Sequence, residues 1–216
     1  MDISQNHSIM IVSALDKLLA QALASIIKTK LGLKTYQKIE ARLQERYGLS
    51  IAESIKEFYK LDATLREFFG AGVDALEGDI LNHLISLDTS SKSNTWITIE
   101  YHDLANLILE AYGDREKRII LDAALKKPGV VLDILESCNI PKSSGYRIVS
   151  QLVDDGLLTE EGYDTTSDGK KVTRYTALFE NVKIDVEKGG VVVRVLLKVD
   201  ILRESYLVKT LLELHV

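Results

Sequence analysis

Residues 140–158 carry polar side chains at spacings that suit contact with nucleic acid. This run reads IPKSSGYRIVSQLVDDGLL, with a proline near its start and Asp-Gly-Leu-Leu at its end. At helical spacing Gly145, Val149 and Leu152 fall on one face, which predicts contact with a core. The residues predicted to face outward are Lys142, Ser143, Ser144, Tyr146, Arg147, Ser150 and Gln151. Arg and Lys can bond guanine or phosphate, Gln can bond adenine, and Ser and Tyr can bond phosphate oxygens.

Two interpretations fit this helix on its own. One is a helix that reads DNA, and the other is an ordinary amphipathic surface helix, whose outward face is polar as a rule. A helix that binds protein would more naturally expose apolar residues, and Ile148 is the one apolar residue predicted to be exposed.

The flanking sequence supplies elements that would position such a helix. Residues 115–127 and 130–139 form two runs of apolar periodicity, separated by Pro128-Gly129. Downstream, two strand candidates flank Ser167-Asp168-Gly169-Lys170, where Asp-Gly supplies the positive φ of a tight hairpin. The order helix, helix, turn, helix, hairpin predicts a winged helix-turn-helix, whose third helix enters the major groove while the hairpin, or wing, contacts the DNA backbone.

Residues 115–199 resemble the winged-helix domains of archaeal regulators related to the ArsR and TrmB families. The likeness lies in RIILDAAL from Arg118, in ILESCNIPKSSGYRIVSQLVDDGLL from Ile134, and in TSDGKKVTRYTAL followed by FENVKIDVEKGGVVVRV. The resemblance implies DNA contacts by Lys142, Ser143, Ser144, Tyr146 and Arg147, with Lys170, Lys171 and Arg174 contributing from the wing. Gly145 departs from the pattern, in which Val or Cys is common, so the start of the helix is expected to be either looser or more closely packed than usual.

The N-terminal part of the chain predicts a helical module. Gly32 and Gly48 are expected to stop helices, residues 50–53 form a capping box, and Asp62 is expected to cap a helix that ends at Gly70. A last helical run is predicted over residues 73–87. The pattern of this module also resembles the small helical output domain fused to winged helices in regulators of ammonia-oxidising archaea, which transfers no site residues.

The predicted fold class is mainly α with a small β component (α+β). Its parts are an all-helical N-terminal module (1–88), a Ser-rich linker with a connecting helix (89–113), a winged helix-turn-helix domain (114–199) and a C-terminal helix (200–216). The C-terminal run is too apolar for a solvated tail, so it either folds back on the winged domain or pairs with a second copy. A homodimer suits DNA with two symmetric half-sites. Trp96 either anchors the two modules together or, more simply, covers an edge of the core.

Composition narrows the classes of function. The net charge of −5 and the nearly balanced charges of residues 115–199 argue against a protein that coats nucleic acid, but they allow a small basic reading face. The single Cys138 is predicted to be a buried hydrophobe, which favours a reducing, cytoplasmic location. The four histidines are scattered without ligand spacing, so no metal and no cofactor is expected. Residues 9–27 lack a positive leader and contain Asp16-Lys17, which argues against a signal peptide or a membrane span.

No enzyme chemistry is predicted. Phe69-Gly70-Ala71-Gly72 lacks the Lys-Ser or Lys-Thr of a phosphate loop. Asp154-Asp155 and Glu160-Glu161 are neighbours whose side chains point apart, so they predict a solvated face rather than an acid/base pair. The sequence therefore predicts a transcription regulator that binds double-stranded DNA and is modulated through its N-terminal module by a small molecule or a protein. The alternative is a winged helix that serves as a protein-interaction adaptor.

Overall fold

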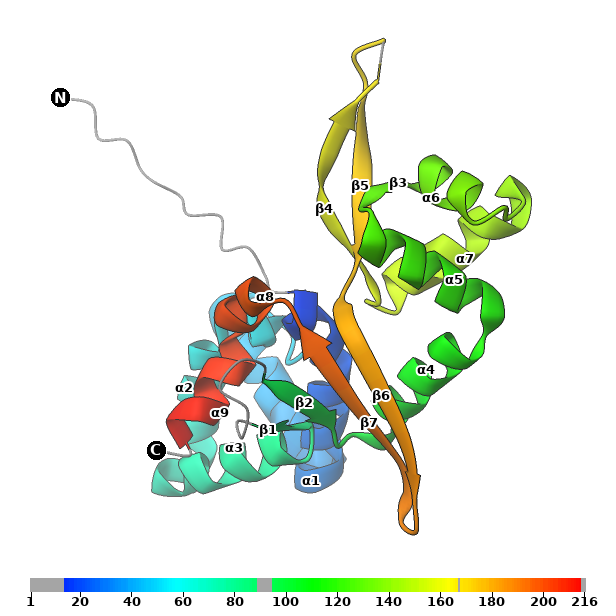
Figure 1. The fold of residues 1–216 in the computed structure, drawn as a ribbon. Helices are drawn as coiled ribbons and strands as arrows, with labels where there is room; N and C mark the ends of the chain where they lie inside the picture. Colours follow the sequence, from blue (N-terminus) through cyan, green and yellow to red (C-terminus); the bar gives the residue numbers. More distant parts are fainter. Residues whose placement is uncertain (1–13, 89–94, 167, 215–216) are drawn as a thin grey trace, which may run out of the picture.

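The chain folds into helices and two antiparallel sheets, which confirms the predicted α+β class (Figure 1). The computed structural model describes residues 14–88, 95–166 and 168–214. The helices are α1 (Ala14–Tyr47), α2 (Phe58–Phe69), α3 (Val73–Asn82), α4 (His102–Gly113), α5 (Arg115–Lys126), α6 (Val131–Ser137), α7 (Lys142–Asp154), α8 (Val199–Glu204) and α9 (Tyr206–Leu214), with the 3-10 helices η1 (Glu53–Glu57) and η2 (Gly70–Gly72). The strands are β1 (Ile85–Asp88), β2 (Trp96–Ile99), β3 (Gly129–Val130), β4 (Leu158–Thr165), β5 (Lys171–Ala177), β6 (Phe179–Glu187) and β7 (Gly190–Leu197). No helix in these described ranges has the length and apolar composition needed to cross a bilayer.

The helix ends and caps predicted from the N-terminal sequence are mostly confirmed. Gly32 interrupts α1 with non-helical angles (φ 74, ψ 159). Ser50 and Glu53 form a reciprocal capping box, in which the Ser50 N–H donates to Glu53 Oε2 at 2.9 Å and the Glu53 N–H donates to Ser50 Oγ at 3.2 Å. The predicted cap at Asp62 is wrong. Helix α2 begins at Phe58, so Asp62 lies inside it and pairs with Arg66 one turn later.

Residues 85–88 form a strand, which corrects the prediction of an all-helical N-terminal module. Strand β1 lies at the edge of a sheet ordered β1-β2-β7-β6, and Ile85 pairs with Ile99 of β2. Pairing with β2, which itself pairs with β7, buries Ile85 completely, and this tertiary contact overrides the local helical periodicity. Most of the predicted linker, residues 89–94, lies outside the described residues. Asp88 and Trp96 on either side of it are direct partners in the sheet register.

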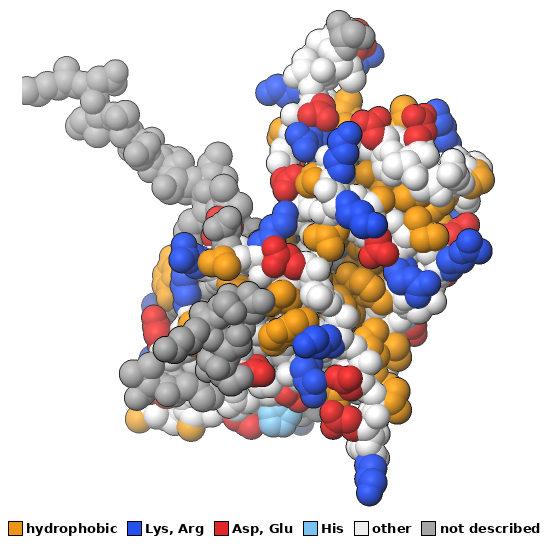
Figure 2. All heavy atoms as spheres, viewed as in Figure 1, with side chains coloured by type: hydrophobic (Ala, Val, Ile, Leu, Met, Phe, Trp, Pro, Cys, Tyr) orange, Lys and Arg blue, Asp and Glu red, His pale blue; other side chains and the backbone are white. Residues whose placement is uncertain are grey.

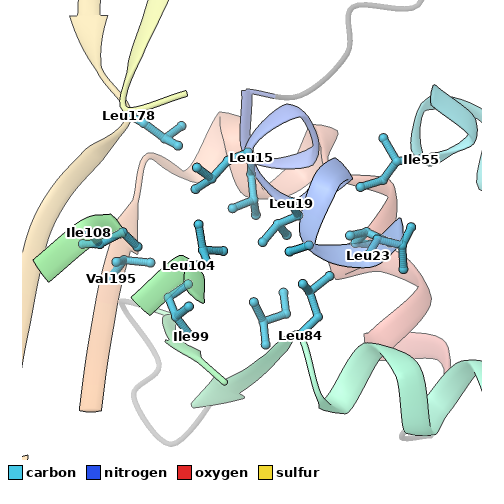
Figure 3. Packing of buried hydrophobic residues seen from close by; sticks show 14 of the residues in the cluster. Leu15, Leu19, Leu23, Ile55, Leu84, Ile99, Leu104, Ile108, Leu178 and Val195 are labelled. Atoms are coloured by element: carbon cyan, nitrogen blue, oxygen red, sulfur yellow. The ribbon is translucent and has the colours of Figure 1, made fainter. Parts of the chain in front are cut away.

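One continuous core joins the first helix, the four-stranded sheet and α4 (Figure 3). Leu15 and Leu19 of α1 face Leu104 of α4, with Leu84 and Ile99 below them in the view. Full burial of each such side chain contributes about 1.5–3 kcal/mol. Apolar residues from both sides of the predicted boundary near residue 88 therefore pack in the same core, and β2 and α4 lie against α1.

The C-terminal segment packs against the N-terminal helices of its own chain, an arrangement that neither of the two sequence-based alternatives included. The Ser205 hydroxyl donates to Asp16 Oδ1 at 2.6 Å, and the Tyr206 N–H donates to Asp16 Oδ2 at 2.9 Å. Ser205 also caps α9 by accepting from the Val208 N–H at 3.2 Å, so the segment forms two short helices rather than one. Leu207 is fully buried. Burial raises the pKa of Asp16, although its hydrogen bonds with Ser205 and Tyr206 act in the opposite direction.

Candidate nucleic-acid interface

Helices α5, α6 and α7 pack against a three-stranded sheet ordered β3-β5-β4. The two-residue strand β3 lies between α5 and α6 in the chain and pairs with β5, with Gly129 opposite Tyr175. Strands β4 and β5 form a hairpin that extends beyond the helices at the top of Figure 1. At its tip the Thr166 N–H donates to the Lys170 carbonyl at 2.9 Å. The predicted turn is therefore present, although Ser167 itself lies outside the described residues.

Helix α7 buries the face that its sequence predicts. Gly145, Val149 and Leu152 are buried as expected. Ile148, which was predicted to be exposed, is only 4% exposed. The reason is its spacing, because Ile148 lies three residues after Gly145 and four before Leu152 and so belongs to the same helical stripe. The correction leaves α7 with a polar outer face.

Gly145 permits unusually close packing of α7 on α6. Of the two expectations for the start of this helix, the closely packed one therefore holds and the looser one does not. A Cβ added to Gly145 would lie 2.5 Å from Cδ2 and 2.7 Å from Cδ1 of Leu135. Leu135 is fully buried, so its side chain has little space into which it can move. The close approach of Leu135 fills the space that a side chain at position 145 would otherwise occupy.

Gly145→Ala is expected to lower the free energy of unfolding by about 1–2 kcal/mol in a urea titration. Overpacking costs about 1–3 kcal/mol, and the better helix propensity of alanine offsets up to about 1 kcal/mol of this. In a Leu135→Ala background the clash is gone, so Gly145→Ala should then stabilise the protein. Stabilisation of the otherwise unchanged protein by Gly145→Ala would show that the two helices are not closely packed here.

The end of α7 is fixed by a hydrogen-bonded stop at Gly156. The Leu157 N–H donates to the Leu152 carbonyl at 2.9 Å, and the Gly156 N–H donates to the Val153 carbonyl at 3.0 Å. Gly156 adopts φ +74, and a Cβ there would lie 3.4 Å from the Cα of Leu18 on α1. The Asp-Gly-Leu-Leu stop is thus confirmed, and it also brings the end of α7 against the first helix of the chain.

The exposed face of α7 holds most of the predicted site residues. Those that are exposed are Lys142, Ser143, Tyr146, Arg147, Ser150 and Gln151. Ser144 is half-buried, and its hydroxyl donates to the Pro141 carbonyl at 3.2 Å. Gln151 borders a small depression that Asp103 and Glu110 of α4 also line, so it lies on the flank of α7 nearest α4. The remaining members form a continuous polar surface over the first three turns.

The predicted cations differ in whether they already have an acidic partner. Lys142 Nζ lies 3.4 Å from Glu136 Oε1, and Lys170 Nζ lies 3.0 Å from Asp168 Oδ2. Arg147 and Lys171 have no ion-pair partner within the described part of the chain. Figure 2 shows the same mixture, with Lys and Arg interspersed with Asp and Glu around the β4–β5 hairpin.

Arg174 is engaged inside its own domain. Its Nη2 donates to the Pro128 carbonyl at 3.2 Å, and its Nη1 lies 3.5 Å from Asp164 Oδ1. These contacts join the base of the hairpin to the residue before β3. The structure thus places Arg174 away from the hairpin tip, which carries Lys170 and Lys171.

A group of carboxylates that was not predicted from the sequence lies between α2 and α3. Oxygens of Asp62, Asp74 and Glu77 lie within 4.8 Å of one another. The Arg66 guanidinium pairs with both Asp62 and Asp74, so it supplies the positive charge that a bound metal ion would otherwise supply. Glu77 is 5% exposed, and its Oε1 has no hydrogen-bond partner among the described atoms. Burial, with the nearby Asp62 charge, raises the pKa of Glu77 to about 7. Residue 62 and residues 74–77 come together only when α2 and α3 pack, so no local spacing signals the group.

Four further carboxylates lie around one hollow, and this grouping was not predicted from the sequence. They are Asp103 of α4, Asp154 and Asp155 at the end of α7, and Glu160 of β4. The grouping forms because α4 packs beside the turn that follows α7. The adjacent positions of Asp154 and Asp155 in the sequence therefore do not indicate it.

Comparisons with known proteins give no further assignment. No protein-family model, no curated protein and no solved structure matches this chain. A function for the chain therefore has to be inferred from its own residues and their arrangement.

Proposed function

We propose that this chain is a sequence-specific DNA-binding transcription regulator of the winged helix-turn-helix type. In this proposal α7 enters the major groove and the β4–β5 hairpin, the wing, contacts the DNA backbone. The observation that carries the proposal is the exposed face of α7, with cations and hydroxyls, next in the chain to a hairpin that projects from the fold and bears Lys170 and Lys171. The element order α5, β3, α6, α7, β4, β5 agrees with this architecture.

Distinct roles follow from the contacts of each side chain. Ser143 lies in the first turn of α7, where free backbone N–H groups favour phosphate, and Lys142 precedes it. Arg147 is exposed and unpaired in the described structure, so it is available for a guanine edge. Lys171 is available for a backbone phosphate, and Lys170 becomes available when DNA phosphate replaces Asp168 as its partner. Arg174 is proposed to hold β3 and the wing base together instead of contacting DNA.

A protein-interaction adaptor is the second candidate, and one observation favours it. Two of the cations on the proposed reading surface, Lys142 and Lys170, are already paired with carboxylates, which weakens attraction for a polyanion. Against it stands the burial of Ile148, because the correction removes the only apolar residue that α7 was expected to offer a protein partner.

A selection experiment tests the proposal. The purified chain is incubated with randomised duplex DNA at moderate salt, and the retained fragments are sequenced beside those retained by the Lys142→Ala/Arg147→Ala variant. Enrichment of one motif by the unmodified protein, absent with the variant, is the expected result. A motif with two symmetric half-sites would further support a homodimer on DNA. Retention without enrichment, or equal retention by the variant, would move the adaptor to first place.

A further inference from the structure

A cavity of about 530 Å³ lies where α1, α4 and the turn after α7 meet. Its apolar lining comes from Leu18 and Ala22 of α1, Leu104 and Leu107 of α4, and Leu158 of β4. Leu104 also belongs to the core in Figure 3, where it lies beside Leu15 and Leu19 of α1, so the apolar side of the cavity is continuous with that core. The volume falls within the range of about 300–1,000 Å³ that is usual for small-molecule sites. The space is therefore large enough for an organic molecule of moderate size.

The polar groups of the cavity are strongly biased toward negative charge. Asp103, Asp154, Asp155 and Glu160 contribute carboxylates, and Lys17 is the only cation among the lining residues that the structure describes. Asp103 accepts a hydrogen bond from the Tyr101 hydroxyl at 3.0 Å. No Lys or Arg of the described ranges forms an ion pair with any of these four carboxylates. The lining thus has a net negative charge beside an apolar wall.

Asp155 is less exposed than the other three carboxylates. It is half-buried and lines both the cavity and the adjoining depression between α4 and α7. Burial raises its pKa, the Asp154 and Glu110 charges act in the same direction, and Lys117 opposes them. A cation placed beside Asp155 would relieve this repulsion.

We propose that this cavity binds an organic cation with a bulky apolar body. The body would lie on the leucine and alanine wall, and the cationic group would lie beside Asp103 and Asp155. Charge complementarity selects against an anion of the same size and shape, because four carboxylates would face it with only Lys17 in return. The effector site predicted from the sequence lies within the N-terminal module, whereas this site lies between α1 and the end of the proposed recognition helix.

The position of the cavity links ligand binding to α7. Asp154 ends this helix, and Asp155 and Gly156 follow it in the turn that contacts Leu18 of α1. A ligand that touches α1, α4 and this turn together would bias how α7 is held against the rest of the molecule. This coupling rests on the proposed function, because it concerns DNA affinity, whereas binding of the cation does not depend on it.

Tetraphenylphosphonium and tetraphenylborate provide the test, because the two ions share size and shape and differ in the sign of charge. Calorimetric titration of the full chain in sodium buffer is expected to show one phosphonium site and at least tenfold weaker binding of the borate. The Asp103→Asn/Asp155→Asn variant should bind the phosphonium at least tenfold more weakly, while the matched surface variant Glu116→Gln/Glu180→Gln should bind it unchanged. Equal binding of both ions, absence of phosphonium binding, or no effect of the Asp103→Asn/Asp155→Asn variant would overturn the proposal.

Two readouts separate this inference from the proposed function. DNA affinity is measured without phosphonium, and phosphonium binding is measured without DNA. Phosphonium binding by a protein that selects no DNA motif would support the cavity and overturn the regulator. Motif selection without phosphonium binding would support the regulator and overturn the cation site. If both occur, phosphonium is expected to change the affinity for the motif by fivefold or more, and an unchanged affinity would overturn the coupling.

Discussion

The Lys142→Ala/Arg147→Ala variant is expected to bind the selected DNA motif about a hundredfold more weakly than the unmodified protein. Loss of an arginine at a base edge costs about 1–3 kcal/mol, and loss of a phosphate contact adds to this, which gives about 3 kcal/mol in total. The expectation rests on the exposure of both side chains on α7 and on the absence of an acidic partner for Arg147 in the described structure. Fluorescence anisotropy with a labelled duplex measures the change.

The single variants separate the two roles. Lys142→Ala should weaken binding to all duplexes by a similar factor and reduce the slope of log affinity against log salt by about 1. Arg147→Ala should reduce the preference for the motif over unrelated duplex. Lys34→Ala and Arg203→Ala serve as matched controls, since both positions are exposed and lie outside the helices and hairpin proposed to touch DNA. If the controls weaken binding as much as the α7 variants, α7 is not the reading helix.

Glu77→Gln is expected to stabilise the protein by about 3 kcal/mol at pH 8 and to have almost no effect at pH 4. The folded pKa of Glu77 is about 7, above the ordinary value of 4.5, so the folded state favours the protonated carboxyl. Its contribution to stability is therefore complete below pH 4.5 and is lost as the pH rises through 7, at about 1.4 kcal/mol for each unit of pKa shift. Glutamine resembles the protonated form and keeps that contribution at every pH.

Urea denaturation of both proteins at a series of pH values measures this difference. The difference in the free energy of unfolding should grow steadily between pH 4.5 and 7 and then remain constant. Glu180→Gln is the control, because Glu180 is exposed on β6 and surface substitutions change stability by less than about 0.5 kcal/mol. A difference between Glu77→Gln and the unmodified protein that does not vary with pH would show that the carboxylate is better solvated than its position indicates.

The residues of α7 and its flanks were predictable because their signals are local. The buried face follows from helical spacing of Gly145, Val149 and Leu152, and the stop follows from Asp155-Gly156, where glycine adopts the positive φ that other residues avoid. The capping box at residues 50–53 and the β4–β5 hairpin likewise depend on side chains a few positions apart. The burial of Ile148 also follows from helical spacing, because Ile148 lies three residues after Gly145 and four before Leu152.

What only the tertiary structure decided involves residues that are far apart in the chain. Strand β1 exists because β2 pairs with it, the C-terminal helices dock because Asp16 accepts from Ser205 and Tyr206, and Glu77 is buried because α2 packs on α3. The charged cavity forms where three separate segments meet around Asp155. Helical periodicity and turn chemistry involve residues within one or two helical turns of each other. The sequence by itself therefore determines the local elements that depend on them. Contacts between residues that are tens or hundreds of positions apart in the sequence depend on which apolar faces pack together when the chain folds. No local spacing of residues specifies that packing.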